Sequence, residues 1–166
     1  MYYIEILKAF QAENVRYLII GGLAVNLYGV PRVTPDIDLV ISTEKSNILK
    51  LIDVLKQLGY VPRFPVDPED LTDPAKVEDW TKNRNMTAFC FYNKTENYKV
   101  VDIVLVHPLD FESSFKNKTV KKVNGVDVFI ASFDDLVRTK EASGRPQDLS
   151  DIKMLKKVRK LLEGKK

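Results

Sequence analysis

Three aspartates lie in segments that otherwise have the apolar pattern of β-strands. Asp36 and Asp38 are two residues apart in the strand-like segment 36–41, so their side chains share one face, with Cα atoms roughly 7 Å apart. At an effective dielectric near 20, two ionised carboxylates at that distance repel by about 2 kcal/mol, which favours a cation between them. Asp102 interrupts the apolar run 100–106, where an unpaired carboxylate is costly unless it protonates or binds a cation. Carboxylate oxygens are hard ligands, so the three residues predict a site for Mg²⁺ or Mn²⁺.

Simpler interpretations of these carboxylates stay open. A pair such as Asp36 and Asp38 is also typical of a solvated strand end, and a structural lysine or arginine would equally neutralise Asp102. The chain has one cysteine, Cys90, and one histidine, His107. This excludes a disulfide within one chain, a Cys/His zinc site and a Cys/His/Asp triad. Any catalysis must therefore rest on carboxylates, lysines, arginines, hydroxyls and backbone amides.

A second group of residues, upstream of the aspartates, is suited to phosphate. Gly21 and Gly22 lie between an expected buried strand and an expected helix. This arrangement lets backbone amides approach a phosphate at a helix N-terminus. Arg32 and Thr34 would add a guanidinium and a hydroxyl for phosphate oxygens. Each feature taken alone is also typical of an ordinary turn or loop.

The hydrophobic pattern alternates between strand and helix periods along the whole chain, which predicts an α/β or α+β fold. The expected strands are 16–20, 36–41, 86–92, 98–106, 119–123 and 126–130. The expected helices are 3–14, 23–28, 44–58, 133–141 and the segment from 146 onward. Asn124-Gly125 predicts a tight hairpin between the last two strands, and Thr43 is the expected N-cap of the third helix.

The rest of the chain divides into an insertion and a helical end. Segment 62–85 contains four of the eight prolines, and we expect an irregular insertion with one short helix around Pro74 to Trp80. Ser132 predicts a helix N-cap and Pro146 the start of the last helix. The expected apolar face of that helix is Leu149, Ile152, Leu155, Val158 and Leu162. The lysine-rich stretch from Lys153 fits either a solvated helix face or a contact for RNA phosphates.

Length and composition predict one globular domain over 1–166, because the chain has 166 residues and 45% hydrophobic content. The net charge of +3 is too small to indicate a nucleic-acid binder by itself. No run approaches the ~18 apolar residues of a membrane span, so we expect no membrane association. The first residues lack the pattern of a signal peptide, and we expect a cytoplasmic protein.

The combination of motifs is more specific than any one of them. Gly21-Gly22, thirteen intervening residues, the pair Asp36 and Asp38, and the later Asp102 resemble the signature of the DNA polymerase β-like nucleotidyltransferase superfamily. The string GGLAVNLYGVPRVTPDIDLVIS is similar to its small bacterial branch, close to the AbiEii/AbiGii-type abortive-infection toxins. The segment KEASGRPQDLSD, residues 140–151, is similar to the K…R-P-x-D…D stretch of those proteins. The resemblance implies a mixed β-sheet flanked by helices, with C-terminal helices over 132–166.

The resemblance also implies an activity and a set of site residues. Members of that superfamily transfer a nucleoside monophosphate from a nucleoside triphosphate to an acceptor hydroxyl, with loss of pyrophosphate. It assigns a two-metal site for Mg²⁺ or Mn²⁺, and the catalytic role, to Asp36, Asp38 and Asp102, with Asp102 helping to deprotonate the acceptor. The implied nucleotide-binding residues are Gly21, Gly22, Arg32, Thr34, Lys140 and Asp148, among which Lys140 would neutralise the pyrophosphate. Asp148 also fits a plain helix-dipole role, as an acid in a first turn.

The resemblance leaves the acceptor and the biological role open. It implies RNA, tRNA included, or a protein hydroxyl as acceptor, and a part in a toxin–antitoxin or phage-defence pair, with a toxin, an antitoxin or a second copy as partner. Two departures favour an alternative, a non-catalytic nucleotide-binding or partner-binding module. Gly22 stands where many relatives carry serine, and no acceptor-binding helical domain follows. The lack of an acidic, aromatic-rich acceptor domain disfavours a third class, the aminoglycoside-modifying transferases.

Overall fold

The computed structural model describes residues 3–164, so the outermost residues of the expected ranges 1–166 and 132–166 lie outside the described part. The strands are β1 (Tyr17–Ile20), β2 (Asp36–Ile41), β3 (Tyr60–Pro62), β4 (Ala88–Asn93), β5 (Val100–Val104), β6 (Thr119–Val123) and β7 (Val126–Ile130). The helices are α1 (Tyr3–Ala12), α2 (Gly21–Leu27), α3 (Lys45–Gln57), the 3-10 helix η1 (Pro68–Thr72), α4 (Pro74–Asn83), α5 (Phe111–Lys116), α6 (Phe133–Ser143) and α7 (Pro146–Glu163).

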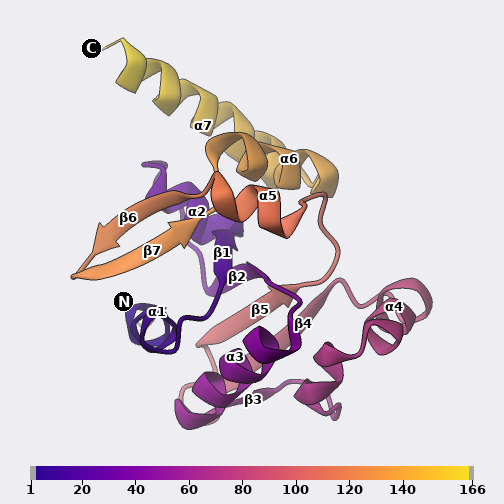
Figure 1. Ribbon diagram of the computed structural model, residues 1–166. Coiled ribbons are helices and arrows are strands. Elements are labelled where there is room, and N and C mark those ends of the chain that lie inside the picture. Colours follow the sequence, from indigo (N-terminus) through magenta and orange to yellow (C-terminus); the bar gives the residue numbers. More distant parts are fainter. Residues whose placement is uncertain (1–2, 165–166) are drawn as a thin grey trace.

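The strands form a seven-stranded sheet in the order β3-β4-β5-β2-β1-β7-β6 (Figure 1). β2 runs parallel to β5 and β1 parallel to β7, whereas the other neighbours are antiparallel. A mixed sheet with helices around it confirms the expected fold class. Among the described residues, no helix combines the length and the apolar character needed to cross a membrane.

The two faces of the central strands differ in chemistry. Ile37 and Leu39 of β2, and Ile103 of β5, are at most 1% exposed and belong to the hydrophobic core. Burying each of these side chains stabilises the fold by about 1.5–3 kcal/mol. The alternate residues Asp36 and Asp38 point to the opposite face, because side chains alternate along a strand. The apolar face therefore holds the strand that presents the carboxylates.

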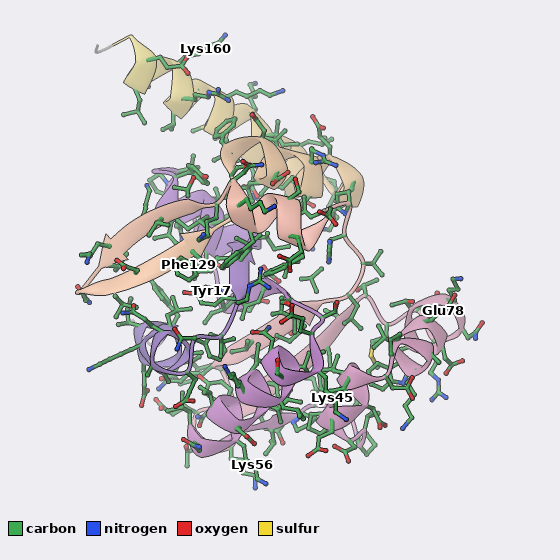
Figure 2. All side chains as sticks on the ribbon, viewed as in Figure 1. Tyr17, Lys45, Lys56, Glu78, Phe129 and Lys160 are labelled. Atoms are coloured by element: carbon green, nitrogen blue, oxygen red, sulfur yellow. The ribbon has the colours of Figure 1, made fainter. Side chains whose placement is uncertain are left out.

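Aromatic contacts extend the core to both ends of the sheet. Tyr17 of β1 packs against Phe129 of β7 with ring centroids 5.5 Å apart, as Figure 2 shows. Trp80 of α4 packs against Phe89 of β4 at 5.6 Å, so α4 lies over the face of β4 that points into the core. Tyr17 and Trp80 are both nearly fully buried.

Segment 62–85 is not the irregular insertion that its prolines predict. Most of it is helical, as η1 and α4, and the expected short helix extends to Asn83. The aspartates that precede the two prolines explain this: Asp67 and Asp73 each accept a hydrogen bond from the first turn of the helix that follows. Proline at the first helical position loses no intrahelical hydrogen bond, so Pro68 and Pro74 start helices here.

Three other local expectations differ from the structure. The N-cap of α3 is Glu44 rather than Thr43. Asn47 explains the difference, because its side chain bonds both backbone groups of Arg16 and the carbonyl of Ser42 and thereby sets the start of α3. α2 begins at Gly21 instead of residue 23. The short helix α5, which Asp110 caps, was not expected.

The helical end agrees with the sequence in its boundaries but not in its buried face. Ser132 accepts the hydrogen bond that caps α6, and α7 begins at Pro146, as predicted. Of the expected apolar face of α7, Ile152 and Leu155 are buried, whereas Leu149 and Leu162 are 58% and 60% exposed. The first turns of α7 instead bury two aspartates, and its far half projects from the rest of the molecule (Figure 1).

Gly21 tests the packing between α2 and β2. Its φ is +65°, and a Cβ there would overlap Oδ2 of Asp38. We expect Gly21→Ala to lower the free energy of unfolding in urea by about 3–4 kcal/mol, from backbone strain and the displaced carboxylate together. Gly125→Ala is the matched control, because Gly125 has a φ of +80° but nothing within 4 Å of a Cβ. It should cost only the backbone strain of about 1–2 kcal/mol, and equal losses would contradict the packing argument.

Candidate active site

The three predicted metal-binding aspartates meet on one face of the central sheet. The parallel pairing of β2 with β5 places Asp38 directly opposite Asp102, and Asp36 lies two residues before Asp38 on the same face. One carboxylate oxygen from each residue lies within 4.8 Å of the other two. The strands therefore bring together oxygen atoms that are suited to a shared divalent cation.

Burial and mutual repulsion make this cluster unfavourable without a cation. Burial, with the charges of Asp36 and Asp102, raises the pKa of Asp38 to about 6, although Arg145 and Lys140 partly offset the rise. Burial also raises the pKa of Asp102. Its Oδ1 is buried and has no hydrogen-bond partner among the described residues. An unpartnered oxygen beside two further carboxylates fits the donor set of Mg²⁺ or Mn²⁺.

Cys90 lies beside this cluster, which the sequence gave no reason to expect. It is the cross-strand neighbour of Asp102 in the antiparallel pairing of β4 with β5. Burial, a hydrogen bond with Asp102 and the charge of that carboxylate raise the pKa of the thiol to about 12. A raised pKa keeps the thiol protonated at neutral pH, which disfavours it as a nucleophile.

The glycine turn lies close against β2 and the segment before it. Gly21 and Gly22 form the first turn of α2 rather than a loop before it. A Cβ on Gly22 would lie 2.7 Å from Oγ1 of Thr34. The hydroxyl of Thr34 thus occupies the space that a side chain at residue 22 would need, which explains the glycine. Thr34 also donates a 3.2 Å hydrogen bond to the carbonyl of Asp36.

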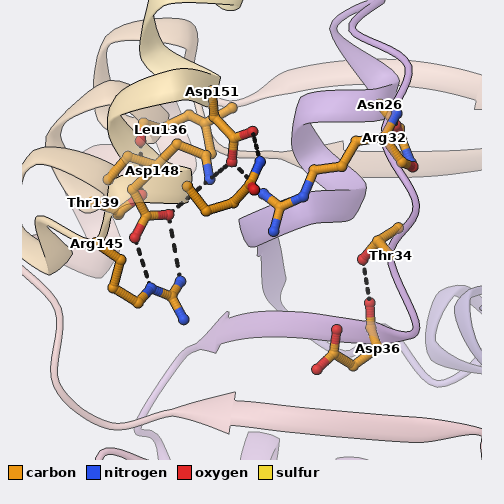
Figure 3. Close-up of polar contacts among 11 residues, drawn as sticks. Asn26, Arg32, Thr34, Asp36, Leu136, Thr139, Arg145, Asp148 and Asp151 are labelled. Atoms are coloured by element: carbon orange, nitrogen blue, oxygen red, sulfur yellow. Dashed lines mark hydrogen bonds and ion pairs between the residues drawn. The ribbon is translucent and has the colours of Figure 1, made fainter.

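Arg32 is held in place through its backbone. Asn26 of α2 accepts a hydrogen bond from the Arg32 amide and donates one to its carbonyl, both at 2.7 Å. Four of the predicted nucleotide-binding residues therefore lie together: Arg32 and Thr34 pack against the turn that Gly21 and Gly22 form. Figure 3 shows Thr34 beside Asp36. Their contact with nucleotide stays a prediction.

Lys140 and Asp148, the other two predicted nucleotide-binding residues, belong to a buried ionic cluster (Figure 3). Nζ of Lys140 lies 3.2 Å from Asp148 and 2.7 Å from Asp151. Asp148 also accepts hydrogen bonds from Arg145, and Asp151 forms an ion pair with Arg32. Burial acts to raise the pKa of Asp148, but the hydrogen bonds it accepts outweigh this effect and hold the pKa at about 2. The sequence motif pointed to Lys140 and Asp148 but not to the roles of Arg145 and Asp151 in this cluster.

The fold and the site together define a nucleotidyltransferase, with neighbouring strands that carry three carboxylates beside a glycine turn. Residues 4–162 match the family described as "Nucleotidyltransferase of unknown function (DUF6036)", and the chain belongs to this family. The resemblance to nucleotidyltransferases is thus confirmed, while the closer likeness to AbiEii-type toxins stays a prediction. A comparison with curated protein sequences finds no match.

Solved structures with a similar fold include antibiotic-modifying nucleotidyltransferases. The lincosamide antibiotic adenylyltransferase LnuA, in its lincomycin-bound structure, is 20% identical with a TM-score of 0.60, and the match covers 95% of this chain and 94% of LnuA. ANT(2")-Ia in complex with adenylyl-2"-tobramycin is 17% identical with a TM-score of 0.57, over 96% and 92% of the chains. An antigenic nucleotidyltransferase-like protein from Paracoccidioides brasiliensis is 19% identical with a TM-score of 0.50, over 90% and 71%. These likenesses show the fold.

The match in length overturns one argument from the sequence. The aminoglycoside-modifying transferases were disfavoured because the sequence shows no acidic, aromatic-rich acceptor domain. LnuA and ANT(2")-Ia are nearly covered by this chain, and both are structures with an antibiotic or its adenylylated product bound. The length of the given sequence is therefore no argument against a small-molecule acceptor.

The raised pKa of Asp38 predicts that metal binding depends on pH. Below about pH 6 a proton occupies Asp38 and competes with the cation, so Mn²⁺ affinity should rise as the pH increases from 5 to 7 and then level off. The rise should approach tenfold per pH unit below the pKa, because one proton is released. Titration calorimetry at pH 5, 6, 7 and 8 measures it. Asp38→Asn should bind weakly without this dependence, and a wild-type affinity that does not change with pH would contradict the assignment.

The ionic cluster predicts that two lysine substitutions lower the free energy of unfolding by very different amounts. Lys140→Met leaves two buried aspartates short of a partner and should lower the free energy of unfolding by about 3–5 kcal/mol. Lys122→Met is the control, because that side chain is 70% exposed in its ion pair with Asp127. Exposed pairs contribute about 0–1 kcal/mol. Urea denaturation of both variants provides the measurement, and similar losses would refute a structural role for Lys140.

Proposed function

We propose that this protein is a metal-dependent nucleotidyltransferase that moves a nucleoside monophosphate from a nucleoside triphosphate to an acceptor hydroxyl. The observation that carries the proposal is the meeting of Asp36, Asp38 and Asp102 within 4.8 Å, with one buried oxygen that lacks a partner among the described residues. These carboxylates would hold two Mg²⁺ or Mn²⁺ ions. When bound, such ions stabilise the attacking and leaving oxygens of an in-line displacement.

Asp102 would help to deprotonate the acceptor hydroxyl. Its pKa is raised by burial, which brings it closer to neutrality and makes the carboxylate a better base than an exposed aspartate. The Cys90 thiol, which stays protonated, would orient that carboxylate from the neighbouring strand.

On the other side of the aspartates, Gly21, Gly22, Thr34 and Arg32 would bind the triphosphate. The hydroxyl of Thr34 lies against the first turn of α2 and would take the place of a hydroxyl at residue 22. This interpretation removes one of the two departures that favoured a non-catalytic module. The intact set of three carboxylates is the second reason to prefer an enzyme.

The acceptor is RNA, tRNA included, or a protein hydroxyl in this proposal, and the context is a toxin–antitoxin or phage-defence pair in the cytoplasm, with a partner protein or a second copy. The exposed lysines of α7, such as Lys153, Lys156 and Lys160, support a polyanionic acceptor, since they lie on the projecting helix (Figure 2). A small-molecule alcohol is the second candidate, because solved structures with a similar fold include ones with lincomycin and adenylyl-tobramycin.

Label transfer tests the proposal. Purified protein is incubated with Mg²⁺ or Mn²⁺, each α-labelled ribonucleoside triphosphate, and total RNA, cell protein, lincomycin or tobramycin in turn. We expect label in one acceptor class, and a loss of about 10³-fold in Asp36→Asn, because a metal ligand contributes several kcal/mol of charge stabilisation. Asp53→Asn, an exposed residue of α3, is the matched control and should transfer normally.

The same experiment separates the enzyme from the alternative module. Triphosphate binding that needs no metal and produces no labelled acceptor would support a non-catalytic nucleotide-binding protein. Failure to bind any triphosphate would refute the enzyme and the nucleotide-binding module, and would leave a partner-binding module.

A further inference from the structure

The ionic cluster that lies near Asp36 and Asp38 contains two arginines and one lysine. The side chains of the arginines reach solvent, whereas that of Lys140 does not. The side chain of Lys140 is 3% exposed and enclosed by Asp148 and Asp151, whereas those of Arg32 and Arg145 are 25% and 70% exposed. A buried ammonium that already contacts two carboxylates is a poor first contact for a phosphate. The accessible positive charge of the cluster therefore belongs to the two guanidinium groups.

Each arginine is anchored by one buried aspartate. Arg32 forms its ion pair with Asp151, and Arg145 donates from Nε to Asp148 at 2.7 Å and from Nη2 at 3.4 Å. Lys140 contacts both aspartates, so one ionic cluster holds both arginines. Figure 3 shows both guanidinium groups on the side of the ionic cluster that faces β2 and Asp36. Anchoring lowers the entropy that each side chain would lose on binding a ligand.

The free nitrogens of both arginines lie close to the proposed reaction centre. Nη1 of Arg145 has no partner among the described residues, and its charge acts on Asp38. Arg32 lies against the first turn of α2, where its Cζ would be 3.4 Å from a Cβ on Gly22. The two side chains come from separate elements: Arg32 from the segment before β2, and Arg145 from the start of α7.

We propose that Arg145 is a phosphate-binding residue that acts with Arg32 as a pair, and that the two guanidinium groups hold the β- and γ-phosphates of the triphosphate and then the leaving pyrophosphate. The proposal rests on the proposed function, since it assigns a role within the same site. Planar guanidinium groups suit this ligand, because each offers parallel N–H donors to phosphate oxygens. Arg145 is the new assignment, and Lys140 has no direct contact with phosphate in this arrangement.

Binding measurements separate this role from a structural one. Titration calorimetry with Mg²⁺ gives the Kd of ATP, CTP, GTP, UTP, the matching monophosphates and inorganic pyrophosphate for wild type and Arg145→Gln. We expect a Kd about 10- to 100-fold higher for the triphosphate and for pyrophosphate, as for the loss of a charge-assisted hydrogen bond. The monophosphate, which lacks the β- and γ-phosphates, should bind within about twofold of wild type. Arg32→Gln should show the same pattern.

Three controls accompany the variant. Arg159→Gln removes a guanidinium from the same helix, where it pairs with Asp134 and Glu163, and should leave every Kd unchanged. Arg145→Lys keeps the charge but not the fork of donors, and should recover part of the affinity. Mn²⁺ binding at pH 8, where Asp38 is ionised, shows whether the aspartates of Arg145→Gln are intact, and it should be retained.

The outcomes distinguish the inference from the function on which it rests. Equal triphosphate affinity in wild type and Arg145→Gln would overturn the inference and leave the proposed function standing. Equal losses for monophosphate and triphosphate would also overturn it, because they would indicate a damaged site. A wild-type protein that binds no triphosphate would overturn the inference together with the proposed function.

Discussion

The parallel pairing of β2 with β5 is the contact on which the rest of the site depends, because it sets Asp38 directly beside Asp102. Three carboxylates within 4.8 Å repel one another, and the raised pKa of Asp38 is the measure of that repulsion and of burial. The alternate residues of the same strands, such as Ile37 and Ile103, are buried in the core and offset the cost. The strands are thus held by one face while the other face carries charges that a divalent cation would neutralise.

The ionic cluster around Lys140 imposes a second constraint, on the helices that follow the sheet. A buried charge is tolerated only with partners, and Lys140, Asp148 and Asp151 supply them to one another between α6 and α7. The partners determine which face of α7 turns inward. They also connect α7 to Arg32, and therefore to the segment that leads into β2. The packing of α6 and α7 consequently places the positively charged side chains of Arg32, Lys140 and Arg145 near the predicted metal-binding aspartates.

Expectations from the sequence were correct where the signal is local. Asn124-Gly125 closes the hairpin of β6 and β7, and Ser132 caps α6, because each feature depends on residues within a few positions. Thr43 was a wrong cap, since the long-range hydrogen bonds of Asn47 set the start of α3. The helices of segment 62–85 were underestimated, because proline counts as a breaker unless the capping residue before it is considered.

The sequence alone determined the residue types that can do chemistry here. One cysteine and one histidine excluded a Cys/His zinc site and a Cys/His/Asp triad, and the spacing of Asp36 and Asp38 in a strand required a shared face. Only the tertiary structure decided which groups meet. That Cys90 lies beside Asp102, and that Lys140 is enclosed while Arg145 reaches solvent, depends on strand register and on the rotation of α7. Register and rotation follow from the burial of apolar surface and from pairings between distant segments, such as Asp38 with Asp102 and Arg32 with Asp151.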